Sequence, residues 1–145
     1  MDRLTVPGTL QSLAHITEFV VHMAAAANLE PRVTYRLRLA VDEIVTNIIT
    51  HGYDRAGQRG EITIWAQVEG QHLIVCVEDQ GVSYDPRQVS PPDDLDRPLD
   101  KRKAGGLGVY LALGNVDQFR YEQDEDCNRS IFIVSRPGCG ARGLQ

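Results

Sequence analysis

The chain has 145 residues, of which 42% are hydrophobic and 24% are charged, and its formal net charge is −5. This length and this apolar fraction are typical of a single globular domain, and they exclude a disordered chain. An acidic total argues against a direct nucleic-acid partner, because nonspecific binding depends on Lys and Arg that neutralise phosphates. No apolar stretch approaches the roughly 20 residues that span a bilayer, so we also expect no membrane contact.

The positions of the three cysteines indicate the redox state of the cellular compartment. Cys76, Cys127 and Cys139 are far apart and show no C-x-x-C spacing. They are typical of free thiols in a reducing environment rather than of a disulfide framework. The N-terminus has no long apolar run after Arg3 and does not resemble a secretory signal. The sequence therefore favours a cytoplasmic location.

The first half of the chain is expected to be mainly helical. A short extended segment at Leu4–Val6 comes first. Apolar residues then recur every three or four positions over residues 10–29 and again over residues 32–50, which predicts two amphipathic helices. Gly52 is expected to end the second helix, as a glycine after the last periodic residue often does.

After the second helix the hydrophobic period changes to two. Residues 62–68 alternate between apolar and polar side chains, which predicts a strand with one exposed face. Leu73–Val77 is apolar throughout, as expected of a strand covered on both faces. Gly70-Gln71 between them indicates a tight hairpin. Two more strands are predicted at Gln118–Gln123 and Ser130–Ser135.

A long polar segment, Pro86–Lys103, separates these two pairs of strands. A loop of this length is uncommon in a compact domain and is usually functional. A short helix is expected over residues 107–116, and the glycine-rich tail over residues 137–145 is expected to fray. About three helices and a mixed, mostly antiparallel sheet predict one domain over residues 1–136, built as a two-layer α/β sandwich.

The first cluster with possible chemistry lies in the second predicted helix. Glu43 and Asn47 are four residues apart, so both project from one face, and His51 continues the row. A glutamate can accept a proton from a hydroxyl or from water, and an asparagine oxygen suits Mg²⁺. The same spacing is also typical of a solvated helix face, and alone it does not distinguish the two interpretations.

The second cluster follows the apolar strand. Asp79 stands at the end of that strand, where a lone carboxylate is costly unless a donor satisfies it. The exocyclic amine of a nucleobase is one such donor. Gly81 permits a close approach that a Cβ would prevent. An Asp-x-Gly turn that simply ends a strand explains the same residues.

The third cluster is Gly105-Gly106-Leu107-Gly108, at the start of the short third helix. Backbone N–H groups exposed at the positive end of a helix dipole suit a phosphate group. Arg102 and Lys103 would add positive charge. A flexible hinge is the alternative, although three glycines in four residues favour a close contact.

The order of these clusters along the chain resembles the GHKL ATPase superfamily. Within it, residues 43–51 and 105–111 are most similar to the anti-sigma-factor serine kinases of bacterial stress and sporulation switches. The resemblance extends to about Arg136 and implies a Bergerat-type ATP-binding fold. It also implies a Mg²⁺-ATP-dependent kinase that phosphorylates a serine of an anti-sigma-factor antagonist protein. Such a kinase also sequesters a sigma factor and can form a homodimer.

The resemblance further implies a role for each cluster. Glu43 would be the general base, Asn47 would bind Mg²⁺, and Asp79 would accept a hydrogen bond from the adenine amine. The loop over residues 86–104 would be the ATP lid, and the glycine cluster would hold the triphosphate. The remaining implied nucleotide contacts are His51, Gly81, Ser83, Arg102, Lys103, Gly105, Gly106, Leu107, Gly108 and Ser130.

The chain departs from the pattern of this family in three places. Ser83 replaces the second glycine of D-x-G-x-G, and residues 114–117 replace a Met-Asp-Glu segment. Asn128-Arg129-Ser130 replaces G-T-T, so Ser130 alone keeps a hydroxyl near the base, while Tyr121 is interpreted as a packing residue. Three alternatives remain open: a non-catalytic switch that binds nucleotide, an ATPase that regulates another signalling enzyme, and a binding domain without nucleotide.

Overall fold

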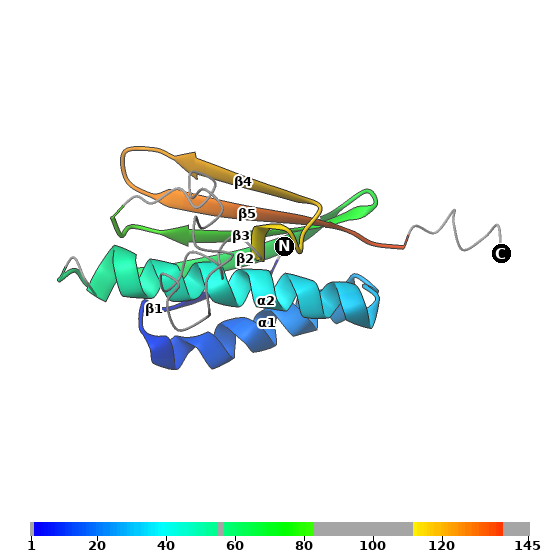
Figure 1. The fold of residues 1–145 in the computed structure, drawn as a ribbon, viewed down its shortest axis with the longest axis horizontal. Helices are drawn as coiled ribbons and strands as arrows, with labels where there is room; N and C mark the ends of the chain where they lie inside the picture. The colour runs from blue at the N-terminus through cyan, green and yellow to red at the C-terminus, as the bar shows by residue number, and fades with distance from the viewer. Residues whose placement is uncertain (1, 55–56, 83–111, 138–145) are drawn as a thin grey trace, which may run out of the picture.

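The structure, a computed structural model, describes residues 2–54, 57–82 and 112–137. In chain order its elements are β1 (Asp2–Pro7), the 3-10 helix η1 (Leu10–Ser12), α1 (Leu13–Ala26), α2 (Pro31–Asn47), the π-helix η2 (Ile48–Asp54), β2 (Glu61–Glu69), β3 (His72–Asp79), β4 (Gln118–Gln123) and β5 (Asn128–Ser135). The strands form one sheet in the order β1-β2-β3-β5-β4, and each described pairing is antiparallel. Helices α1 and α2 lie against one face of this sheet (Figure 1), which confirms the two-layer α/β sandwich.

The core lies between the helices and the sheet. Ile62 and Ile64 of β2 are fully buried, and they belong to one cluster with Ile16 of α1 and with Leu37 and Val41 of α2. The period of two in the strand and the period of three to four in the helices direct these side chains to the same layer. This packing fixes the sheet relative to α2, which carries the predicted Glu43–Asn47 pair at its C-terminal end.

The first predicted helix differs from the observed one at both ends. It begins as η1, and Leu10, which the prediction included in the apolar stripe, is 51% exposed. It ends at Ala26, before Asn28, whose φ of 60° is incompatible with a continuing helix. The residues that α1 buries are Ile16, Val20, Met23 and Ala24.

The prediction that Gly52 ends the second helix is wrong. Helix α2 ends at Asn47, and the chain continues as η2 to Asp54 with the wider winding of a π-helix. Gly52 is buried within η2, and its carbonyl oxygen accepts a hydrogen bond from the Val82 N–H at 3.0 Å. The end of the helical segment is therefore tied to the chain that follows β3.

The four strands predicted after the helices are confirmed, but three of them are longer than expected. β2 is longer by one residue at each end, β3 continues past Val77 to Asp79, and β5 begins at Asn128 rather than at Ser130. In the β3–β5 ladder Asp79 and Asn128 are direct partners. The hairpin between β2 and β3 turns at Gly70, whose φ of 61° suits a glycine.

The second face of β3 is only partly buried. On this face Cys76 is 3% exposed and Ile74 is half-buried, although the described part of the chain provides no layer beyond it. Burial raises the pKa of the Cys76 thiol to about 12, so this side chain acts as an apolar packing group. The expected burial on both faces is thus complete on the helical side and, on the other face, is found at Cys76 but not at Ile74. None of the helices within residues 2–54, 57–82 and 112–137 has the length and apolar character of a membrane span.

Several predictions fall outside the described residues. They are the loop at 86–104, the first half of the predicted third helix and the tail from residue 138. Residues 112–116 of the helix predicted over 107–116 are described. Residues 112 and 113 are helical, whereas residues 114–116 form a turn and a bend, so the predicted end of this helix at residue 116 is wrong. The predicted site residues that lie outside the description are Ser83, Arg102, Lys103, Gly105, Gly106, Leu107 and Gly108.

Candidate functional site

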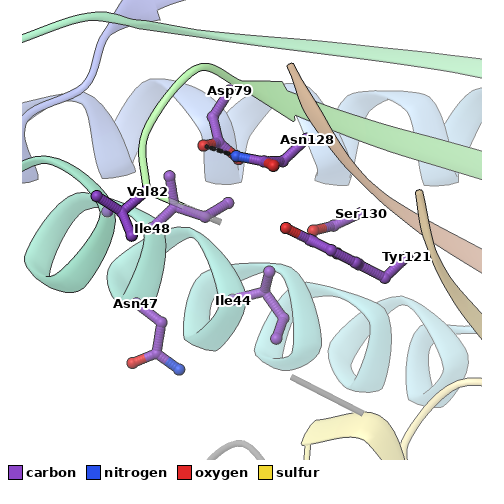
Figure 2. A pocket seen from close by; sticks show the side chains of 9 residues that line it. Ile44, Asn47, Ile48, Asp79, Val82, Tyr121, Asn128 and Ser130 are labelled. Atoms are coloured by element: carbon purple, nitrogen blue, oxygen red, sulfur yellow. Dashed lines mark hydrogen bonds between the residues drawn. The ribbon is translucent and has the colours of Figure 1, made fainter. Parts of the chain in front are cut away.

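A pocket lies between the C-terminal end of α2 and the part of the sheet formed by β3, β5 and β4 (Figure 2). It contains about 340 Å³ of empty space, part of which is open to solvent. The lining residues are Ile44, Asn47, Ile48, Gly52, Asp79, Val82, Tyr121, Asn128 and Ser130.

The pocket has an apolar side and a polar side. Ile44 and Ile48 come from the helical segment, and Figure 2 shows them across the pocket from the polar groups of Asp79, Asn128 and Ser130. An apolar cleft with a few converging polar groups holds a ligand by burial and orients it by hydrogen bonds. A flat heteroaromatic ring, such as a nucleobase, has both kinds of surface.

Asp79 is the buried charge of the pocket and is 3% exposed. Its Oδ1 accepts hydrogen bonds from the Gly81 N–H at 2.9 Å and from the Asn128 Nδ2 at 3.1 Å. Its Oδ2 accepts none from the residues that the structure describes. Burial raises the pKa of the Asp79 carboxyl, and the hydrogen bonds from Asn128 and Gly81 oppose that rise. The site therefore holds a buried acceptor that a ligand donor would satisfy.

Asn128 was not among the site residues predicted from the sequence. Its Nδ2 donates to Oδ1 of Asp79 and, at 3.0 Å, to the carbonyl oxygen of Gly81. Both partners are acceptors, so the orientation of the amide is determined by the hydrogen bonds. The replacement of G-T-T by Asn128-Arg129-Ser130 was the visible signal, but its meaning depends on the cross-strand pairing with Asp79.

Gly81 makes a close approach, as predicted, but the described contact is with the chain itself. A Cβ on Gly81 would lie 2.8 Å from the carbonyl oxygen of Gly52, which is closer than real Cβ contacts come. The neighbouring Val82 N–H donates to the same oxygen. The absence of a side chain at Gly81 thus lets the turn after Asp79 pack directly on η2.

Tyr53 is a second residue near the pocket whose role has no signal in the sequence. It is 1% exposed, and its hydroxyl donates to the Glu61 carbonyl oxygen at 2.8 Å and accepts from the Gln80 N–H at 2.9 Å. Its ring lies where a Cβ on Gly8 or on Gly60 would approach within 2.6 or 2.7 Å. Burial raises the pKa of the Tyr53 hydroxyl, which remains protonated and able to donate. Tyr53 therefore joins η2 to the turn that follows Asp79.

The predicted row of polar residues on the second helix is interrupted. Asn47 lines the pocket, and Figure 2 shows its amide pointing away from Asp79. Glu43 is partly buried one turn earlier in α2, and neither Glu43 nor His51 lines the pocket. The change to π winding at Ile48 alters the spacing on which the row was based. The roles of Glu43 and His51 stay predictions.

Ser130 lines the pocket, as its predicted place near a nucleobase requires, and it is 2% exposed. Tyr121, interpreted from the sequence as a packing residue, lines the pocket as well. The structure thus brings Asn47, Asp79 and Ser130 together from three separate segments of the chain. Oδ2 of Asp79, which accepts no hydrogen bond from residues 2–54, 57–82 and 112–137, fits an exocyclic amine. The amide oxygen of Asn47 fits Mg²⁺, an ion that keeps most of its shell as phosphate and water.

Comparison with known proteins identifies the family to which the chain belongs. Residues 6–133 match the family described as the Histidine kinase-like ATPase domain. The Serine-protein kinase RsbW of Bacillus cereus is 34% identical over 93 residues, which are 61% of this chain and 56% of that protein. The protein of the same name from Bacillus licheniformis is 33% identical over 98 residues, 66% of this chain and 61% of the relative. The chain therefore spans little more than half the length of these relatives.

Solved structures show the same fold. The RsbU and RsbW domains of Rv1364c from Mycobacterium tuberculosis superpose with a TM-score of 0.62 at 17% identity, over 95% of this chain and 34% of that one. The catalytic domain of the histidine kinase ThkA superposes with a TM-score of 0.52 at 14% identity, over 95% and 99% of the two chains. At such identities the likeness shows the fold alone.

Proposed function

Because the chain belongs to the histidine kinase-like ATPase family, we propose that it is a Mg²⁺-ATP-dependent serine protein kinase of the anti-sigma-factor type. The observation that carries the proposal is the pocket that combines the free buried oxygen of Asp79 with Asn47. The relatives named serine-protein kinase support serine as the acceptor. The alternative, a switch that binds nucleotide without catalysis, shares the pocket and differs only in the chemistry at Glu43.

In this proposal the adenine amine donates to Oδ2 of Asp79, and the ring packs against Ile44 and Ile48. Asn47 binds Mg²⁺ through its amide oxygen, at the side of the pocket away from Asp79. Bound Mg²⁺-ATP supplies the phosphoryl group and partial neutralisation of its charge. We assign the triphosphate to the glycine cluster at 105–108 together with Arg102 and Lys103, under a lid at 86–104.

Glu43 would accept the proton of the substrate serine hydroxyl. Its place one turn before Asn47 in α2 puts it outside the pocket that is proposed to hold adenine. Phosphoryl transfer asks a protein mainly for positioning and charge neutralisation, so one carboxylate near the phosphates is a sufficient base. His51, Gly81, Ser83 and Ser130 remain proposed contacts of the nucleotide.

The proposed partners are those of a partner-switching module. They are an anti-sigma-factor antagonist that carries the substrate serine, a sigma factor that the kinase sequesters, and a second copy of the chain. We propose that these contacts are made in the cytoplasm, where the free thiols of Cys76 and Cys127 would remain reduced. The test is whether the protein transfers the γ-phosphate of radiolabelled ATP to a serine of an antagonist that co-purifies with it.

Glu43→Ala is expected to leave ATP affinity within about twofold of wild type. It should lower the rate of phosphate transfer by roughly 10²- to 10⁴-fold, because the hydroxyl loses its base. Calorimetry with ATP measures the first quantity, and radiolabel transfer measures the second. Glu18→Ala, which removes an exposed carboxylate of α1, is the matched control. Unchanged transfer in Glu43→Ala would contradict the assignment of the base and favour another proton acceptor.

Asn47→Ala is expected to weaken ATP binding in the presence of Mg²⁺ by about tenfold, which is the effect of roughly 1.4 kcal/mol. In EDTA the same variant should bind ATP as the wild type does, since the lost amide oxygen acts through the metal. Titration of the wild type and the variant with ATP, in Mg²⁺ and in EDTA, separates the metal-dependent part of the affinity from the rest. An equal loss with and without Mg²⁺ would show that Asn47 acts on the nucleotide directly.

A further inference from the structure

We propose that Asn128 determines the base selectivity of the pocket, because it occupies one oxygen of Asp79 and leaves the other for the ligand. The inference rests on the proposed function in one respect, namely that the ligand is a nucleotide. Asn128 acts through Asp79 and is a positioning residue. No part of the family resemblance assigns it a role.

The contact between Asp79 and Asn128 follows from the pairing of β3 with β5. Asp79 ends β3, Asn128 begins β5, and the two are direct partners in the antiparallel ladder. Both side chains are buried, with exposures of 3% and 5%. Figure 2 shows the carboxylate and the amide side by side, joined by the hydrogen bond to Oδ1. Because both groups lie inside the protein, their orientation does not depend on solvent.

The amide nitrogen of Asn128 has two hydrogens, and both are used. One bonds Oδ1 of Asp79 at 3.1 Å, and the other bonds the carbonyl oxygen of Gly81 at 3.0 Å. The Gly81 N–H supplies a second donor to the same Oδ1, at 2.9 Å. Three hydrogen bonds thus hold the carboxylate and the turn as one unit, and Oδ1 has little capacity left for a further donor.

Purine bases differ in the number of adjacent hydrogen-bond donors that they can present to a carboxylate. Guanine offers two adjacent donors, its ring N–H and its exocyclic amine, which pair with both oxygens of a carboxylate. Adenine differs because its exocyclic amine lies beside a ring nitrogen that accepts hydrogen bonds. It can therefore donate to only one oxygen of a carboxylate. A carboxylate with one free oxygen therefore suits adenine, and buried polar groups without partners penalise the wrong ligand.

The test is the ratio of ATP affinity to GTP affinity, measured by calorimetry on the full chain with Mg²⁺. In Asn128→Ala we expect ATP affinity to fall about tenfold and the ratio to fall by at least about tenfold, since Oδ1 regains room for a second ligand donor. A purely structural role would lower both affinities together and leave the ratio unchanged. Gln118→Ala, which removes an exposed amide from β4, is the control.

The outcomes separate this inference from the function on which it rests. A wild type that binds no ATP overturns both. A wild type that binds ATP, with a ratio in Asn128→Ala within about twofold of wild type, overturns the role of Asn128 alone. If the alanine variant does not fold, Asn128→Ser replaces it. A single hydroxyl cannot bond both Asp79 and Gly81, so the same fall in the ratio is expected.

Discussion

Asp79→Asn is expected to make the folded protein more stable at neutral pH while it abolishes ATP binding. The amide oxygen of an asparagine can still accept the hydrogen bonds from Gly81 and Asn128, so only the buried charge is removed. Single stabilising substitutions commonly raise the free energy of unfolding by about 0.5–2 kcal/mol, and we expect a gain of this size here. Binding is lost because the amide would present N–H groups to the adenine amine, and two donors cannot pair.

The gain in stability should depend on pH in a defined direction. Burial raises the pKa of the Asp79 carboxyl in the folded protein, so the folded state holds this proton more tightly than the unfolded state does. At pH values below the ordinary range of a carboxyl, both states are protonated and the charge costs nothing. As the pH rises through the raised pKa, the folded wild type must ionise a buried group and loses stability. The difference between variant and wild type should therefore widen from acid to neutral pH.

Urea unfolding of both proteins across this pH range measures the effect, and ATP titration measures the loss of function. Asp126→Asn removes an exposed carboxylate of the β4–β5 turn and is the control, with an expected change within about 0.5 kcal/mol. An Asp79→Asn variant less stable than wild type at pH 7 would mean that the charge is compensated in the folded protein. Retained ATP binding would remove Asp79 from the site.

Gly81→Ala is expected to lower the free energy of unfolding by about 1–3 kcal/mol, the usual cost of inserting an atom into a filled space. The added Cβ would lie 2.8 Å from the Gly52 carbonyl oxygen, which is a backbone atom and cannot rotate away. The turn would have to move from η2, which would strain the Val82–Gly52 hydrogen bond and displace Asp79. ATP affinity should fall with stability.

Thermal and urea unfolding measure the loss of stability, and calorimetry measures the loss of affinity. The adjacent Gln80 has an exposed side chain, so Gln80→Ala is a matched control with an expected change within about 0.5 kcal/mol. Its backbone N–H, which bonds Tyr53, is kept. A Gly81→Ala protein with the stability of the wild type would show that the turn and η2 are not in contact in solution.

Most of the fold followed from local patterns. Alternation predicted β2. The carboxylate at the end of an apolar run marked Asp79 as a candidate, but its predicted role came from the order of the three clusters and the family that this order resembles. The roles of Asn128 and Tyr53 did not follow, because each depends on a hydrogen bond between distant segments. Asn128 meets Asp79 across 49 positions of sequence, and Tyr53 meets Gln80 across 27. Spacing within one element carries no information about such pairs.

The helical predictions failed at the ends of helices for a related reason. A period of 3.6 extends Glu43 and Asn47 to His51 only while α winding continues, and it stops at Ile48. A π-helix has no composition of its own that a pattern could reveal, and here its course is accompanied by contacts of Tyr53 and Gly52 with the turn after β3. Tertiary contacts overrode local periodicity at the segment that borders the pocket.

Gly52 and Gly81, which meet where η2 contacts the turn after β3, differ in the room that each has for a side chain. A Cβ on Gly52 would find its nearest neighbours at 3.7 and 3.8 Å, an ordinary separation, whereas one on Gly81 would overlap main-chain atoms. A methyl group therefore fits at position 52 and does not fit at position 81, even though both glycines belong to the same contact. No second-site change of a side chain could rescue position 81, since main chain meets main chain there. The turn that follows Asp79 can therefore accept few substitutions at position 81 without a shift of its backbone.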